Sequence, residues 1–136
     1  MTAHLIDANI ILRYLTNDPP DMAARASALF HDIAAGIITV TVEDIVLAEV
    51  VWTLRSFYRV ERIRIADQLI ELIADDNIVN SDKPSLSLAL TLYRQYNLGF
   101  ADAILAARSL TQGDTEIISF DRGISRVPGV VRREPS

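Results

Sequence analysis

Short strands that alternate with longer helices are the feature that most limits the folds open to this chain. Brief β-branched or aliphatic runs are followed by segments in which apolar residues recur with the helical period. The expected strands are residues 5–6, 37–41, 78–79, 116–120 and 130–131. The expected helices are residues 10–15, 42–58, 61–74, 83–96 and 100–110, with one more that begins after a cap at Asp18 or Asp21 and runs to about Ala35. Such alternation predicts an α/β fold with a largely parallel sheet.

The length and the absence of a linker predict a single domain over residues 1–136. The chain begins without the basic start and long apolar run of a signal peptide. No stretch approaches the ~18 uninterrupted apolar residues that a membrane span requires. The chain contains no cysteine, which excludes disulfides and thiolate chemistry. We therefore expect a cytoplasmic protein without a membrane partner.

Two acidic residues directly follow predicted strands. Asp7 comes after the first strand and Asp121 after the strand at residues 116–120. In open α/β sheets, ligands bind outside the carboxyl ends of the strands. Both carboxylates are therefore expected at that edge, although acids at such positions also serve as helix caps. Asn9 and Ser119, two residues from these acids, could cap or hydrogen-bond a neighbouring carboxylate.

Two further acids lie on predicted helices. Glu49 has Ile45 and Val46 one turn before it and Trp52 one turn after it, which places a carboxylate on an apolar face. A buried carboxylate needs a cationic partner or a metal, so Glu49 is expected to bind a metal, to pair with an arginine or to lie at the rim of the core. Asp102 lies near the start of the helix at 100–110, where it could equally well cap that helix.

Four carboxylates that meet at one sheet edge would need a cation to be ionised together. Oxygen-only ligation favours Mg²⁺ or Mn²⁺, which also bind substrate phosphates. Such an ion can activate a water and stabilise the leaving oxygen of a phosphodiester. The sequence therefore points to a metal-dependent nuclease whose site residues are Asp7, Glu49, Asp102 and Asp121.

The net charge of −5 argues against a nucleic-acid partner, although twelve of the thirteen basic residues are arginine. A metal-free ribonuclease would need histidines as acid and base, and only His4 and His31 are present. Strand alternation predicts that His4 lies on the face opposite Asp7. An aspartyl phosphatase would carry a second aspartate where Asn9 stands, so we also disfavour that class.

Residues 5–15, 47–54, 100–106 and 119–122 resemble, in order and spacing, the four motifs of PIN-domain ribonucleases. More narrowly, they are similar to the VapC toxins of bacterial and archaeal VapBC toxin–antitoxin pairs. The resemblance implies a three-layer α/β/α sandwich with a central, mainly parallel sheet over the whole chain. It also implies an endoribonuclease that hydrolyses RNA phosphodiesters with a metal-activated water and forms no covalent intermediate.

The resemblance further implies a role for each site residue. Asp7, Asp102 and Asp121 would be metal ligands, and Glu49 would orient or deprotonate the attacking water. Asn9 and Ser119 would support these ligands from outside the coordination sphere.

The partners implied by the resemblance are an RNA substrate, a VapB-like antitoxin whose tail occupies the acidic groove, and a second copy of the chain in a homodimer. Arg13 and Arg122 are candidate phosphate contacts, although both could equally be solvated surface residues. A catalytically inactive PIN-fold module for binding or scaffolding is the alternative function.

Overall fold

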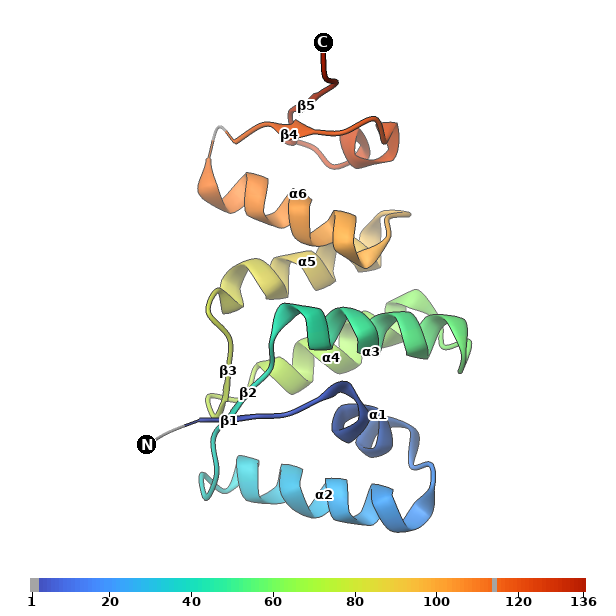
Figure 1. Ribbon diagram of the computed structural model, residues 1–136, viewed down its shortest axis with the longest axis vertical. Coiled ribbons are helices and arrows are strands. Elements are labelled where there is room, and N and C mark those ends of the chain that lie inside the picture. The colour runs from blue at the N-terminus through green and yellow to red at the C-terminus, as the bar shows by residue number, and fades with distance from the viewer. Residues whose placement is uncertain (1–2, 114) are drawn as a thin grey trace. The chain divides into compact units, whose positions relative to one another are not determined.

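Helices form most of the chain because apolar residues recur at three- and four-residue intervals along it. The computed structural model describes residues 3–113 and 115–136 (Figure 1). The α-helices are α1 (Ala8–Thr16), α2 (Pro20–Ala34), α3 (Asp44–Ser56), α4 (Arg62–Ile73), α5 (Lys83–Gln95) and α6 (Phe100–Gln112), and a 3₁₀ helix, η1, covers Arg122–Arg126. The strands are β1 (His4–Leu5), β2 (Val40–Thr41), β3 (Ile78–Val79), β4 (Ile117–Ile118) and β5 (Arg132–Arg133). The expected α/β fold is confirmed.

Several element boundaries differ from the sequence-based expectation. The prediction that Asp18 or Asp21 caps α2 is wrong, because the cap residue is Pro19 and no side chain bonds there. Strands β2 and β4 are shorter than expected, and β5 begins at Arg132, two residues later than the predicted start at 130. The backbone N–H of Ile117 donates to the carbonyl of Val131 at 2.9 Å, so hydrogen-bond register, rather than the apolar pair, sets the limits of β5.

The chain divides into two compact units, of which the first contains residues up to Val60 together with Glu71–Ser81. Its sheet is parallel in the order β1-β2-β3, and helices flank this sheet (Figure 1). Helix α1 packs against both α2 and α3. The rings of Tyr14 and Phe30 stack with centroids 4.2 Å apart, which ties α1 to α2. The largest fully buried side chains of this unit are Ile11, Ile33, Val40, Val42, Leu47, Val50 and Leu54.

The second unit contains Glu61–Ile70 and Asp82–Ser136. Helices α5 and α6 pack along each other, and α6 also contacts β4 and η1. Strands β4 and β5 pair in parallel, with Ile117 opposite Arg132. The largest fully buried side chains of this unit are Ile65, Leu69, Leu86, Leu90 and Ile124. Among the described residues, no helix has both the length and the apolar character needed to cross a membrane.

Candidate active site

Asp121 lies in the turn between β4 and η1 and caps η1. Its carboxylate accepts a hydrogen bond from the backbone N–H of Gly123 at 2.8 Å. Its own backbone N–H donates to Oγ of Ser119 at 2.9 Å. A Cβ at position 123 would lie only 3.0 Å from Oδ1 of Asp121, so glycine permits this close approach. Ser119 thus supports Asp121 through the backbone and not through the carboxylate.

Asp102 is the third residue of α6 and is half-buried. Because α6 contacts η1, the carboxyl groups of Asp102 and Asp121 come within hydrogen-bonding reach of each other. Burial raises the pKa of Asp102 above its usual value, and the charge of Asp121 and the hydrogen bond between the two groups raise it further. Two carboxyl groups that face each other in this way favour a proton or a cation between them.

Two arginines that the motif analysis did not identify hold the chain between α5 and α6. Nη1 of Arg62 donates to the backbone carbonyl of Leu98 at 2.5 Å and to that of Tyr93 at 3.1 Å. Its guanidinium carbon also lies 4.0 Å from the centroid of the Tyr93 ring. Nη1 of Arg126 donates to the carbonyl of Asn97 at 3.0 Å. Their partners are mainly backbone carbonyls, which leave no sequence motif.

Asp7, in the first unit, follows β1 and is the N-cap of α1. Its carboxylate accepts a hydrogen bond from the backbone N–H of Ile10 at 3.2 Å, and the residue is exposed. Asp7 and His4 both line an open hollow of about 590 Å³. Strand β1 covers only His4–Leu5, so Asp7 lies beyond the strand itself.

Glu49 lies on the exposed face of α3. Its neighbours on this face are Ile45 and Trp52, as predicted, but these two residues are 79% and 67% exposed. The face of α3 that is buried carries Leu47, Val50, Val51 and Leu54. The expectation of a buried carboxylate is therefore wrong, because hydrophobic neighbours on a helix do not by themselves bury it.

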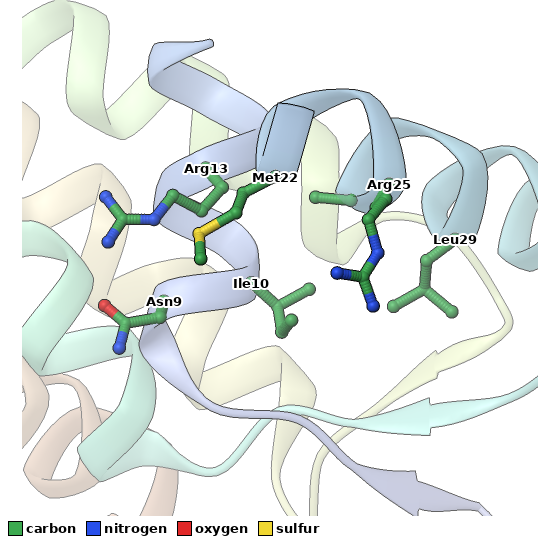
Figure 2. A pocket seen from close by; sticks show the side chains of 7 residues that line it. Asn9, Ile10, Arg13, Met22, Arg25 and Leu29 are labelled. Atoms are coloured by element: carbon green, nitrogen blue, oxygen red, sulfur yellow. The ribbon is translucent and has the colours of Figure 1, made fainter. Parts of the chain in front are cut away.

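Asn9 projects from the first turn of α1 into a groove between α1 and α2 (Figure 2). Within the described part of the chain, its side chain has no hydrogen-bond partner, so a bond to a neighbouring carboxylate is not formed. The groove has about 420 Å³ of open space and is also lined by Arg13 and Arg25.

The structure brings together one pair of the predicted site residues, Asp102 and Asp121. Within each unit, residues 3–113 and 115–136 gather no three Asp, Glu or His side chains that would by themselves enclose a metal ion. The pair nevertheless fits a hard divalent cation, because it offers carboxylate oxygens and no nitrogen or sulfur donor. Mg²⁺ usually takes only one or two protein carboxylates and keeps several waters.

Comparison with known proteins adds a family to this geometry. The PIN domain family matches residues 4–130. The chain is also similar to a protein named VapC ribonuclease from Aquifex aeolicus (strain VF5), with 24% identity over 124 residues that cover 90% of each chain. The match to the family extends over nearly the whole sequence and includes all four acids. This chain belongs to the PIN domain family.

Proposed function

We propose that this protein is a metal-dependent endoribonuclease and acts as the toxin of a type II toxin–antitoxin pair. The observation that carries the proposal is the contact between Asp102 and Asp121, two carboxyl groups that face each other in a protein of the PIN domain family. The similarity to a relative named VapC ribonuclease supports the same activity. The protein would form one domain and would act in the cytoplasm.

The proposal assigns a role to each acid. Asp102 and Asp121, with Asp7, would hold Mg²⁺ or Mn²⁺ through carboxylate oxygens. Such a cation, when bound, supplies water activation and neutralises phosphate charge. Glu49, whose carboxylate is exposed, would accept a proton from the attacking water or orient that water. Ser119 would keep the backbone of Asp121 in place through its 2.9 Å hydrogen bond, and Asn9 would support Asp7 from one turn of α1.

The proposed partners are RNA, a VapB-like antitoxin and a second copy of this chain. An antitoxin would keep the nuclease inactive until needed, and its tail would compete with RNA for the acidic groove. The alternative function is a catalytically inactive PIN-fold module for binding or scaffolding.

Cleavage of a total small-RNA pool tests the proposal. The purified, antitoxin-free protein is incubated with Mg²⁺ or Mn²⁺, and a parallel reaction contains EDTA. We expect discrete products only with metal. Asp7→Ala and Asp102→Asn should each lower the cleavage rate by at least about a hundredfold, since even residues outside the coordination sphere cost 10- to 100-fold.

Asp76→Asn is the matched control for charge. Asp76 is an exposed acid in the turn before β3, and removing its charge should leave cleavage unchanged. If the folded, metal-loaded protein leaves the whole RNA pool intact, the binding-module alternative is favoured. Full cleavage by Asp102→Asn would instead overturn the site assignment.

A further inference from the structure

The groove between α1 and α2 contains two arginines in an otherwise acid-rich protein. Asn9, Ile10 and Arg13 line it from α1, and Met22, Arg25 and Leu29 line it from α2 (Figure 2). These residues recur at three- and four-residue intervals, so each helix contributes one continuous face. The whole chain carries 18 acidic and 13 basic residues, which makes a groove with two cations and no carboxylate unusual here.

Both guanidinium groups are available to a ligand. Nη1 of Arg13 donates to the backbone carbonyl of Asp18 at 3.2 Å, which leaves most of its five donors unused. Among the described residues, neither Arg13 nor Arg25 has a carboxylate within ion-pair distance. An arginine without a carboxylate partner offers a planar fork that matches a phosphate.

Between the two guanidinium groups lies an apolar surface. Figure 2 shows the Met22 side chain between Arg13 and Arg25, with Ile10 facing them from α1. Met22 is 49% exposed, so a flexible thioether is presented to solvent in the groove. An apolar surface flanked by cations suits a ligand that alternates flat apolar groups with negative charges, as a single nucleic-acid strand does.

The position of the groove relates it to Asp7. Asp7 caps α1, and Asn9 and Arg13 follow on the same helix. At 1.5 Å per residue, Arg13 lies roughly 9 Å along the helix axis from Asp7. Stacked nucleotides are spaced about 3.4 Å apart along one strand, so this distance corresponds to roughly two or three nucleotides.

We infer that the α1–α2 groove is an RNA-binding subsite for the nucleotides next to the scissile bond. Arg13 and Arg25 bind successive phosphates, the amide of Asn9 contacts sugar or base, and a base lies against Met22 and Ile10. This inference rests on the proposed function, because it gives the nuclease the phosphate contacts that its overall net charge does not provide.

Binding of a short, labelled single-stranded RNA, measured by fluorescence anisotropy in EDTA over a series of salt concentrations, tests the subsite without cleavage. Each phosphate contact to a single strand contributes about 0.7 to the slope of log K against log salt. We expect Arg13→Gln and Arg25→Gln each to lower that slope by about 0.7 and the double variant by about twice as much. Arg55→Gln, the same charge change on the exposed side of α3, should leave the slope unchanged.

Three results would overturn the inference. The groove variants could bind RNA with wild-type affinity and slope, or Arg55→Gln could lower the slope as much as they do. The groove variants could also bind RNA normally and lose affinity for an acidic polypeptide such as polyglutamate, which would make the groove a protein-docking site.

Cleavage assays on the same proteins separate this inference from the proposed function. The wild-type protein could cleave RNA while the groove variants bind RNA as the wild type does. That result would support the nuclease proposal and would exclude the subsite. Groove-dependent binding by a wild-type protein that cleaves nothing would remove the nuclease proposal and, with it, the position next to a scissile bond, and would leave the groove as an RNA-binding surface only.

Discussion

At the scale of single residues, the contact between Asp102 and Asp121 destabilises the metal-free protein at neutral pH. A functional role of the pair would explain why such a contact is present. The pKa of Asp102 is raised, mainly by burial and then by the charge of Asp121 and the hydrogen bond to it. A carboxyl whose pKa is higher in the folded state than in the unfolded state stabilises the fold only while it is protonated. That contribution is lost as pH rises above the ordinary value of 3.8 and through the raised pKa, so ionised Asp102 destabilises the metal-free protein at neutral pH.

Asp102→Asn removes this charge and keeps the shape of the side chain. We therefore expect Asp102→Asn to have a higher Tm than the wild type at pH 7 in EDTA. The advantage should shrink as the pH approaches 3.8, where the wild-type carboxyl regains its proton. Thermal unfolding at several pH values measures both effects.

The same two proteins in saturating Mg²⁺ provide the control. A ligand at a hundred times its Kd stabilises a fold by about 2.7 kcal/mol, so the wild type should gain stability and Asp102→Asn should gain less. A variant that is less stable than the wild type in EDTA at every pH would show that the carboxyl contact stabilises the fold.

At the scale of elements, the start of α6 depends on a residue from another helix. The N-cap of α6 is Gly99, and no side chain caps it. Arg62 on α4 instead holds the preceding segment through the backbone carbonyls of Tyr93, Tyr96 and Leu98. The Tyr93 ring that Arg62 covers makes an edge contact at 5.9 Å with Phe100, the first residue of α6. Arg62 is thus a positioning residue for Asp102, two residues further on.

Replacement of Arg62 should disturb both the fold and the acid pair. Hydrogen bonds to a charged group contribute about 1.5–3 kcal/mol, so Arg62→Met should lower the free energy of unfolding by roughly 2 kcal/mol. We also expect weaker Mn²⁺ binding by the folded variant, measured calorimetrically well below its Tm. Arg62→Lys should recover only part of the loss, because an ammonium lacks the planar fork.

Arg64→Met is the matched control, because Arg64 is exposed on the same helix. It should leave both the stability and the Mn²⁺ affinity near wild-type values. If Arg62→Met lowers stability and binds Mn²⁺ as tightly as the wild type, Arg62 supports the fold alone and does not position Asp102.

At the scale of the whole molecule, one helix belongs to both compact units. Residues up to Ile70 of α4 belong to the second unit, and those from Glu71 belong to the first. The chain therefore passes between the units more than once, and neither unit is a single continuous segment. A helix that forms cooperatively should couple the two units in unfolding, as the expectation of a single domain requires.

Urea unfolding can test this coupling, because Trp52, the one tryptophan in the sequence, reports on the first unit. We expect its fluorescence transition to coincide with the far-UV circular dichroism transition, which reports on both units. Leu90→Ala, a fully buried position of the second unit, should cost about 2–5 kcal/mol and move both transitions to lower urea. In Leu90→Ala, the Trp52 fluorescence transition could instead stay at its wild-type urea concentration while the circular dichroism transition becomes biphasic. That result would show that the two units are independent domains.

Local features of the sequence determined the elements and the position of each acid within them. Helix periodicity and strand composition depend on near neighbours, so α1 to α6 and β3 lie close to their expected positions. Asp7 and Asp121 follow strands and cap helices, and Asp102 begins a helix, because these placements also depend on local backbone geometry. Membership of the PIN domain family followed from the same spacing of motifs.

Only the tertiary structure decided which side chains meet and which are exposed. The contact of Asp102 with Asp121, the exposure of Glu49, the register of β5 and the groove with Arg25 all depend on residues distant in the sequence. Arg62 shows the physical reason, since its partners are backbone carbonyls that have the same chemistry at every position. A sequence encodes side-chain patterns directly, whereas contacts between distant segments exist only once helices and strands have packed.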